Sequence, residues 1–424
     1  MEPVEYNVNN GEDKKKFGWV KGFSISLFVI VELILVGALV FAGFYINKTK
    51  PLVESGIFHL VTTLDSKYYK EIDKEKMWEG ALRGIADSLG DPYTTYMTMN
   101  EFDSLNTLLT GEYSGVGLTI SYDPDDKHVI VVSPMEGGPA QRAGIKAGDK
   151  IIAVDGTAVW GDKLDDAGQR MRGLEGTSVK LSVVKDGEDV TNSVDIDIVR
   201  ENIVMESVSS EMIDGVGYVR VTTFDQETDR AFSKAVLNLR QSGAKGIIVD
   251  LRGNSGGVLD AACNMADVFL PKNAVIVYTQ DKQGNKKYYN ARTDGNSTPL
   301  VVLVDEGSAS SSEIFAGALK DHGRATLIGK KTFGKGLVQT ILPVVGVGHN
   351  PDGASGDASV EGKFISGYVK VTVAQYFTPS GSNIDKIGIV PDLEVDLGTK
   401  IPFYELEREN DVQLLKALEY INNM

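Results

Sequence analysis

From about Met205 to Asp396 the sequence alternates short apolar runs with longer stretches of helical periodicity. Apolar runs of this length suit strands that are buried on both faces, and the stretches between them suit helices that cover such a sheet. Because consecutive parallel strands need a crossover connection, the alternation predicts βαβ units and a largely parallel sheet. The expected strands read GVGYVRVTTF, GIIVDLRG, AVIVYTQ, LVVLVDE and ATLIGKK, and the expected helices read DRAFSKAVLNLRQSG, VLDAACNMADVFL and SASSSEIFAGALKDHG.

Three regions with different residue patterns lie on either side of this α/β part in the sequence. Residues 53–110 carry apolar residues at three- and four-residue spacing and are expected to be helical. Residues 111–199 consist of short β-rich runs separated by glycine turns, with a short helix within Pro139–Ile151, which predicts a small β-sandwich or barrel. Residues 397–424 form a C-terminal helical segment, with the helix expected over roughly Ile401–Ile421.

The apolar run from Phe23 to Ile46 is about long enough to cross a hydrocarbon core as one helix. Glu32 is the one charge inside it, and lysines are more frequent before the run than after it. This bias favours residues 1–22 in the cytoplasm and the remainder of the chain outside. A cleaved signal peptide is the alternative. An uncleaved anchor at residues 23–46 is favoured, because the run is longer than a typical signal region and no clear Ala-x-Ala site follows.

Composition narrows the chemistry that the chain can perform. The formal net charge is −16 and no local basic patch is evident, so nucleic-acid binding is not expected. The single cysteine, Cys263, excludes an internal disulfide, and four histidines leave little material for a histidine-based metal site. We therefore expect no metal and no cofactor, and chemistry carried by Ser, Lys, Asp, Glu or backbone groups.

Two expected strand-to-helix turns carry groups that can act on a substrate. The turn Asp250–Gly257 is Gly-rich and precedes a helix, so its N–H groups can converge on a negative charge; the alternative is a tight turn without function. It is not a Walker A loop, because no Gly-Lys-Ser/Thr follows the glycines. The turn Asp305–Ile314 holds four serines at the expected start of a helix. A serine at this position can be exposed as a nucleophile. Alternatively, the serines merely cap the helix, with Glu313 as an acidic residue in its first turn.

A third candidate is Lys335, which stands between two glycines in an otherwise apolar context. Partial burial disfavours the charged form of lysine and lowers its pKa, so such an amine can deprotonate a serine without any histidine. Gln339, four residues further on, can hold the amine by hydrogen bonds. Taken alone, Lys335 can equally be a solvated loop lysine.

Together these segments resemble the carboxyl-terminal processing peptidases, also called tail-specific proteases, of peptidase family S41. The resemblance rests on DLRGNSGG, EGSASSSEI and FGKGLVQ in this order and spacing, and it extends from about Val53 to the end of the chain. It includes GDPYTTYM before the β-rich region and YFTPSGSNIDKIGIVPDLEV after the lysine motif. With the transmembrane helix predicted from the apolar run, the expected fold is a multi-domain α/β protein, in which the resemblance implies a helical segment, a PDZ β-domain and, over residues 200–396, a ClpP/crotonase-like protease core.

Residue by residue, the resemblance assigns roles that local reasoning leaves open. It implies that Ser310 is the nucleophile, Lys335 the general base and Gln339 the residue that orients it. The oxyanion hole would consist of the backbone N–H of Ser311 and a glycine N–H of the DLRGNSGG turn, that of Gly256. The other serines of the cluster would then be structural or capping residues.

The sequence departs from the family pattern at three places. Asp305 stands where the family commonly has Asn, and Ser311 where it commonly has Ala. Neither change removes a catalytic group, since Ser311 would contribute only its backbone. The Gly-, Asp- and Ser-rich stretch Val344–Lys363 looks longer than the usual turn. It is expected to be a mobile surface loop that covers the cleft or meets a partner.

The β-rich region, residues 111–199, resembles a PDZ domain. Gly115, Val116, Gly117 and Leu118 match the loop whose N–H groups hold a chain-terminal carboxylate, and the adjoining strand would pair with the peptide by β-augmentation. A domain that captures a C-terminal tail fits mechanically with a peptidase that cuts near it. The expected substrates are therefore proteins or peptides with an exposed apolar C-terminus.

The leading hypothesis is a membrane-anchored serine endopeptidase with its catalytic body outside a bacterial cell membrane. The resemblance also implies a homodimer, and the fused architecture suggests that the PDZ domain gates the active site. A catalytically silent PDZ-containing binding or scaffold protein is the alternative, which the intact Ser310, Lys335 and Gln339 disfavour. A trypsin-like PDZ protease is excluded because neither a Ser-His-Asp set nor a Gly-Asp-Ser-Gly-type loop is present.

Overall fold

The computed structural model describes residues 56–57, 59–122, 127–347 and 363–424, and the chain divides into two units at residues 81 and 82. In the first unit residues 59–67 are helical, and a second helix, α2 (Lys74–Asp87), crosses the division. Within the described residues no helix is long and apolar enough to span a membrane. The expected anchor at residues 23–46 and the tail before it lie outside the described residues.

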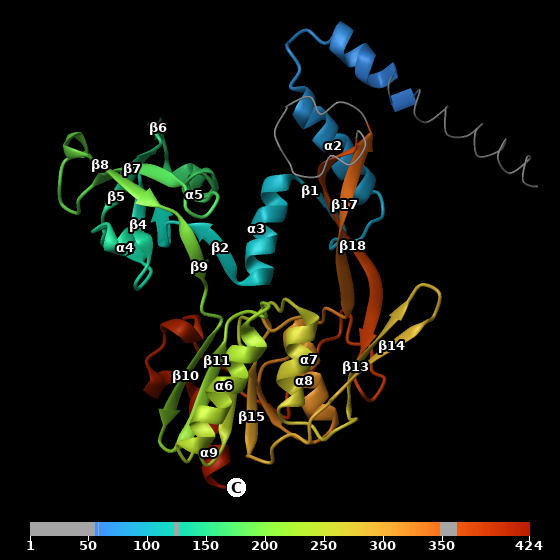
Figure 1. Cartoon of the computed structure of the whole chain (residues 1–424). Coiled ribbons are helices and arrows are strands. Elements are labelled where there is room, and N and C mark those ends of the chain that lie inside the picture. Colours follow the sequence, from blue (N-terminus) through green and yellow to red (C-terminus); the bar gives the residue numbers. More distant parts are fainter. Residues whose placement is uncertain (1–55, 58, 123–126, 348–362) are drawn as a thin grey trace, which may run out of the picture. The chain divides into compact units, whose positions relative to one another are not determined.

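The second unit contains the predicted α/β part, built on a six-stranded sheet (Figure 1). Four strands run parallel in the order β12, β15, β16, β19, with β11 parallel at one side and β10 antiparallel beside it. The prediction of a largely parallel sheet is therefore confirmed. The strands are β10 (Val208–Ile213), β11 (Val216–Val221), β12 (Ile247–Asp250), β15 (Leu300–Val304), β16 (Thr326–Gly329) and β19 (Leu393–Glu394), and the helices are α6 (Thr228–Gln241), α7 (Leu259–Asp267), α8 (Ser311–Asp321) and α9 (Val412–Asn422).

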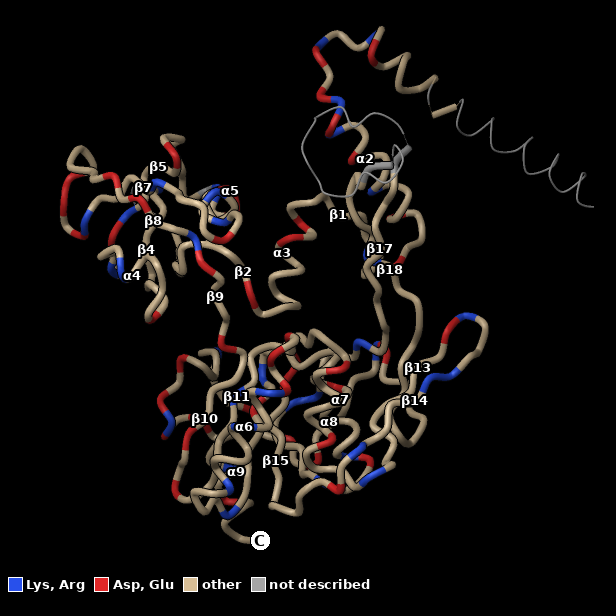
Figure 2. Tube along the Cα trace, in the orientation of Figure 1, with Lys and Arg blue, Asp and Glu red and all other residues tan. Residues whose placement is uncertain are grey.

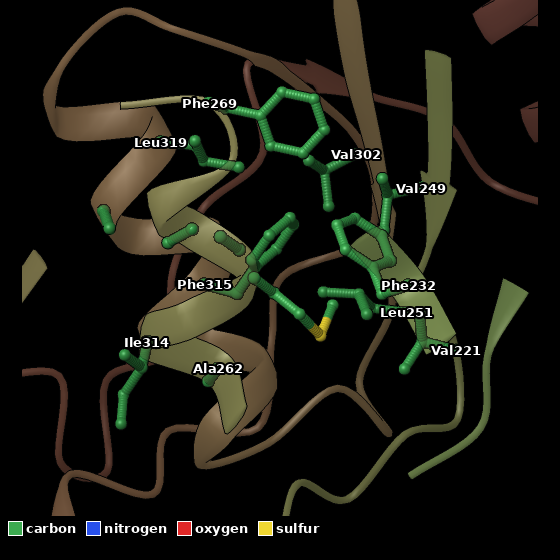
Figure 3. Packing of buried hydrophobic residues seen from close by; sticks show 14 of the residues in the cluster. Val221, Phe232, Val249, Leu251, Ala262, Phe269, Val302, Ile314, Phe315 and Leu319 are labelled. Carbon is green, nitrogen blue, oxygen red and sulfur yellow. The ribbon is translucent and has the colours of Figure 1, made fainter. Parts of the chain in front are cut away.

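The apolar strands are buried on both faces because helices cover both sides of the sheet. Val249 of β12 and Val302 of β15 pack with α6, α7 and α8, while Ile248 of β12 packs with α9 on the opposite side. Phe232, Phe269 and Phe315 meet edge to face in the first of these cores (Figure 3). Truncating one such buried phenylalanine to alanine typically costs about 3–5 kcal/mol, so this core dominates the stability of the region.

A second sheet is antiparallel and carries the segment after the lysine motif. It has the order β1, β18, β13, β14, with β17 also paired to β18. One run predicted for the parallel sheet, AVIVYTQ, forms β13 here; only two residues of β13 are fully buried, so the strand does not need two covered faces. The strands are β1 (Thr95–Met97), β13 (Val275–Asp281), β14 (Lys286–Asn290), β17 (Leu337–Val347) and β18 (Lys363–Phe377).

The segment before the β-rich region is helical only in part. α3 (Met99–Thr110) begins at a capping box formed by Thr98 and Glu101 and ends at Gly111 in the left-handed conformation. Between α2 and α3 the last three residues of the GDPYTTYM motif form β1, which pairs with β18, so this part of the expected helical region is a strand.

The small β-rich domain, for which a β-sandwich or barrel was predicted, forms one six-stranded sheet with its own core. Its strands follow the order β3, β4, β5, β7, β8, with β6 on β5, and two short helices accompany them. A separate ribbon of β2 (Glu112–Gly115) and β9 (Glu201–Val204) flanks it in sequence. The elements are β3 (Leu118–Tyr122), β4 (Val129–Pro134), α4 (Pro139–Arg142), β5 (Lys150–Val154), β6 (Thr157–Ala158), α5 (Leu164–Met171), β7 (Ser178–Val184) and β8 (Val194–Val199).

Two expected boundaries differ near the C-terminus. The last helix, α9, starts at Val412 rather than near Ile401, because Asp411 caps it by accepting the N–H of Leu414, and two short 3-10 turns precede it. β17 and β18 extend to Val347 and Lys363, so the ends of the expected loop are strand, and residues 348–362 lie outside the described residues. Figure 2 shows Lys and Arg interspersed with Asp and Glu along the small β-rich domain and the α/β part.

Candidate active site

The Gly-rich turn and the serine corner lie side by side because they follow neighbouring parallel strands. β12 pairs with β15 in parallel, so the two strands end at the same edge of the sheet. Hydrogen bonds join the two segments: the N–H of Gly253 donates to Asp305 Oδ1 (2.8 Å), and the N–H of Ala309 donates to the carbonyl of Asn254 (3.0 Å). The fold thus places the predicted nucleophile against the predicted oxyanion turn.

Ser310 has a backbone conformation that is rare for a residue with a side chain. Its φ is 54° and its ψ is −111°, at the N-cap of α8. A backbone in such a sparsely populated region costs about 1–3 kcal/mol and is typical of active sites. Gly256 leaves room for this corner, since a Cβ there would lie 2.8 Å from Ser310 Cβ and 2.9 Å from Ser311 N.

The other serines of the cluster are tied to the backbone. Ser308, Ser311 and Ser312 each donate their hydroxyl to a carbonyl of the Asp250–Gly257 turn, over 2.8–2.9 Å. They fix the start of α8 against that turn, as expected for structural serines. Among the described residues, Ser310 is the serine of this cluster whose hydroxyl does not bond to a carbonyl of the turn. This difference gives a physical reason to select it.

Glu313 joins the serine corner to the lysine motif. Its side chain is completely buried and accepts four hydrogen bonds. Oε2 accepts from the backbone N–H groups of Ser310 and Lys335, both at 2.9 Å. Oε1 accepts from Thr332 Oγ1 at 2.5 Å and from the N–H of Gly334 at 2.8 Å. One carboxylate oxygen therefore sets the distance between the backbones of the two predicted catalytic residues.

Lys335 is half-buried, and its amine has an unusual environment. Burial lowers the pKa of Lys335, and repulsion from Lys370 lowers it further, while the charges of Glu313 and Asp91 act in the opposite direction; the net effect is a lowered pKa. The Nζ atom lies over the ring of Tyr93, 4.9 Å from its centre. Lys335 is therefore not a solvated loop lysine, and its lowered pKa means that its amine loses a proton more readily than an ordinary lysine.

Gln339 lies on β17, and its Nε2 donates to Thr372 Oγ1 on β18 over 3.4 Å. No hydrogen bond joins Gln339 to Lys335 among the described residues. The role of Gln339 as the residue that orients the lysine stays a prediction.

The two predicted oxyanion donors differ in availability. In the described part of the chain the N–H of Ser311, at the first turn of α8, has no acceptor, as an oxyanion donor requires. The N–H of Gly256 donates to Asn254 Oδ1 over 2.9 Å, so it would have to be released or shared. The next N–H, of the exposed Gly257, has no acceptor in the same part of the chain.

Sequence reasoning missed what holds the Gly-rich turn in place. The guanidinium of Arg252 is buried and bonds to Asp250 on one side and to Asp411 and Gln413 of the C-terminal segment on the other, over 2.7–3.1 Å. Its central carbon also lies 4.3 Å from the centre of the Phe403 ring. The turn is thus anchored by residues far away in the sequence. The one indication in the sequence was that Asp250 and Arg252, two charged residues, stand within a Gly-rich motif that apolar residues follow.

The predicted peptide-binding loop of the small β-rich domain lies where β2 leads into β3. Gly115 ends β2 and Leu118 begins β3. The carbonyl of Val116 accepts from Ala140 N, and Gly117 has a φ of 71°. In the described part of the chain no acceptor takes the N–H of Val116 or Gly117, which leaves these donors free for a carboxylate. Separately, the described residues contain no group of three or more His, Cys, Asp or Glu that could hold a metal ion.

Comparison with known families matches three successive parts of the chain. Residues 215–395 match the family described as Peptidase family S41, residues 130–185 a PDZ domain, and residues 56–101 the N-terminal domain of the activating protease CtpB. The first two matches fall within the α/β part and the small β-rich domain, respectively.

Relatives extend the match over most of the sequence. The chain is 36% identical over 349 residues to the carboxy-terminal processing protease CtpA of Bacillus subtilis, covering 81% of this chain and 70% of that protein. The chain belongs to the carboxyl-terminal processing peptidases of family S41. A carboxyl-terminal-processing protease of Synechocystis is 37% identical to this S41 peptidase over 347 residues, covering 80% and 76% of the two chains. The protein is therefore a serine peptidase with a PDZ domain.

Solved structures give similar matches. The photosystem II D1 C-terminal processing protease is 33% identical, with a TM-score of 0.44, covering 80% of this S41 peptidase and 86% of that chain. A putative S41 protease from Bacteroides fragilis is 16% identical, with a TM-score of 0.48, covering 84% and 91%.

Proposed function

We propose that this S41 peptidase cleaves proteins near exposed C-terminal tails with Ser310 as nucleophile and Lys335 as general base. The observation that carries the proposal is the single buried carboxylate oxygen of Glu313, which accepts the backbone N–H groups of both residues. The rare backbone conformation of Ser310 and the lowered pKa of Lys335 support the same assignment.

In this mechanism neutral Lys335 takes the proton of the Ser310 hydroxyl as Oγ attacks the peptide carbonyl carbon. The C=O bond becomes a C–O⁻ bond, which the N–H of Ser311 and an N–H of the Gly256–Gly257 pair stabilise. The C–N bond then breaks, and the ammonium of Lys335 gives its proton to the leaving amine. Water hydrolyses the acyl-enzyme by the same proton route.

Gln339 would orient the lysine amine with its side-chain oxygen, which accepts a hydrogen bond, while its Nε2 donates to Thr372. Of the two glycines, Gly257 has an N–H without an acceptor among the described residues, whereas Gly256 must first release Asn254.

The PDZ domain would select the substrate. In the described part of the chain the N–H groups of Val116 and Gly117 have no acceptor and suit a terminal carboxylate, and β-augmentation would hold the residues before it, with an apolar side chain at the last position. We further propose that the peptidase is a homodimer, that tail binding gates the active site, and that the run at residues 23–46 anchors the body outside a bacterial membrane.

The test uses the full chain and an unstructured protein that ends in apolar residues, compared with the same protein ending in charged residues. Products are identified by mass spectrometry for the wild type, Ser310→Ala, Lys335→Ala and the control Lys331→Ala, which changes an exposed lysine of the same loop. We expect cleavage of the apolar-tailed protein by the wild type and by Lys331→Ala only. Cleavage by Ser310→Ala would refute the nucleophile, and tail binding without cleavage by the wild type would favour the silent binding protein.

A further inference from the structure

The turn Asp91–Thr94, which precedes the PDZ domain in the sequence, lies against the lysine motif of the peptidase. It leads directly into β1, whose residue Thr95 pairs with Lys370 of β18. The Nζ atom of Lys335 lies 4.9 Å from the centre of the Tyr93 ring. The turn therefore reaches the predicted general base from a part of the chain that lies outside the α/β core.

Asp91 organises this turn internally. Oδ1 accepts the backbone N–H of Tyr93 over 3.0 Å, and Oδ2 accepts the Thr94 hydroxyl over 2.6 Å. Burial raises the pKa of Asp91, but hydrogen bonds from the hydroxyls of Thr372 and Thr94 and the charge of Lys335 outweigh it, so that its pKa is lowered. Asp91 is therefore an anion whose charge acts on Lys335, and it fixes Tyr93, whose ring lies beside the amine.

The same turn also contacts the residue that engages Gln339. The backbone N–H of Thr372 donates to Thr94 Oγ1 over 3.1 Å, and the hydroxyl of Thr372 accepts Gln339 Nε2. Thr94 is buried, and both bonds are partly buried. A continuous set of hydrogen bonds thus runs from Asp91 through Thr94 and Thr372 to Gln339.

We infer that the Asp91–Thr94 turn positions the general base: Asp91 holds Tyr93, whose ring contacts the amine of Lys335, and Thr94 holds Gln339 through Thr372. These are positioning residues, since none of them reacts with the substrate. The inference rests on the proposed role of Lys335 and extends it to residues that no family motif of the peptidase core contains. It also makes the active site depend on the segment before the PDZ domain.

The charges around Lys335 fix the sign of the expected effect. Lys370 of β18 disfavours the ammonium form, while Glu313 of α8 and Asp91 of the turn favour it, and Tyr93 contacts it through its ring. Replacing Asp91 by asparagine keeps an acceptor for the Tyr93 N–H, puts an NH2 group where the Thr94 hydroxyl has its acceptor, and removes one charge that favours the ammonium. The pKa of Lys335 must then fall, and the amine must lose its proton at a lower pH.

The first measurement follows the titration of Lys335 directly in the full chain. Lysines are labelled by 13C reductive methylation in a Ser310→Ala background, and the signal of Lys335 is identified by its loss in Lys335→Arg. The control is Asp87→Asn, which removes an exposed carboxylate four residues before Asp91 that makes no side-chain hydrogen bond among the described residues. We expect Asp91→Asn, and not Asp87→Asn, to move the titration to lower pH. Equal titration curves in the two variants would overturn the inference.

The second measurement is the pH dependence of peptide cleavage with the wild-type serine. In Asp91→Asn the acidic limb of kcat should move to lower pH, while the plateau should fall about tenfold because the base is less well placed. Thr94→Val should lower the plateau as well, and Thr94→Ser should restore it. If the plateau of kcat fell only in proportion to the thermal stability of the variants, and the acidic limb of the pH profile did not move, the turn would have a merely structural role. That result would overturn the inference.

The two proposals fail in different ways. If Lys335→Ala cleaves as fast as the wild type, the assignment of the general base is wrong, and the positioning role falls with it. If Lys335→Ala is inactive but Asp91→Asn matches Asp87→Asn in titration and in plateau, the proposed function stands and the positioning role alone is refuted.

Discussion

Replacing Glu313 by glutamine tests whether one buried carboxylate sets the geometry of the active site. A carboxylate accepts hydrogen bonds at both oxygens, whereas a glutamine amide has one accepting oxygen and one donating NH2 group. Oε1 of Glu313 faces Thr332 Oγ1 and the N–H of Gly334, and Oε2 faces the N–H groups of Ser310 and Lys335. In either orientation of the glutamine amide, the new NH2 group faces at least one backbone N–H. Two hydrogen-bond donors then face each other, and the backbone donor cannot rotate to another acceptor.

The less costly orientation keeps the oxygen toward Ser310 and Lys335. The N–H of Gly334 then loses its acceptor, which costs about 1–3 kcal/mol for a buried donor, and the remaining bonds lose their charge assistance. We expect the free energy of unfolding to fall by about 2–4 kcal/mol in total. Any displacement of Ser310 relative to Lys335 adds a loss of about 10- to 100-fold in kcat.

The assay combines urea unfolding with labelling of Ser310 by a fluorophosphonate and with cleavage of an apolar-tailed protein. The matched control is Glu306→Gln, which changes an exposed glutamate of the same motif. Labelling and cleavage should fall in Glu313→Gln under conditions where the variant is still folded, and Glu306→Gln should match the wild type. Wild-type stability and wild-type kcat in Glu313→Gln would refute the reasoning, because four buried donors would then not need a carboxylate.

Three further predictions concern the base and the turn beside it. Because burial and Lys370 lower the pKa of Lys335, kcat/KM should rise with pH through a deprotonation below the model-peptide lysine value of about 10.4, and a flat pH profile would contradict a lysine base. Arg252→Met leaves two buried carboxylates without their shared cation and should lower the free energy of unfolding by about 3–5 kcal/mol in urea titrations; an unchanged midpoint would mean that the ion network contributes nothing. Gly256→Ala places a Cβ 2.7 Å from the carbonyl of Ala309 and should abolish fluorophosphonate labelling, whereas full labelling would show that the corner adapts.

Much of the fold and the reacting groups could be predicted because their signals are local. The alternation of apolar runs with helical stretches predicted the parallel sheet, and the motif around Ser310 predicted a helix start that the structure has at Ser311. Glu313 was expected only as an acidic residue in the first turn of that helix. It does bond to the N–H of Ser310 there, but its other bonds go to residues 332–335.

The rest could not be predicted because it depends on contacts between distant parts of the sequence. Nothing near Asp91 indicates that its turn meets Lys335, since the contact exists only once β1 has paired with β18. The same holds for Arg252, whose partners on the C-terminal segment lie 159 and 161 residues away. The hydrogen bond from the N–H of Gly256 to Asn254 is local in sequence. The Gly-rich motif nevertheless does not indicate which glycine N–H is already bonded within the turn.

The β2–β9 ribbon makes the PDZ domain an insertion that can be excised from the peptidase. Glu112 is paired with Val204, and the N–H of Met205 donates to the carbonyl of Gly111 over 2.8 Å, so the chain enters and leaves the domain at adjacent points. Paired residues of antiparallel strands lie about 5 Å apart, a gap that a two-residue turn spans. A single short splice can therefore join the Asp91–Thr94 turn and α3 directly to the catalytic sheet, without re-ordering the chain. The domain is also joined to the peptidase by two chain segments rather than one. Two connections restrict its rotation more than the single linker of a terminal domain would.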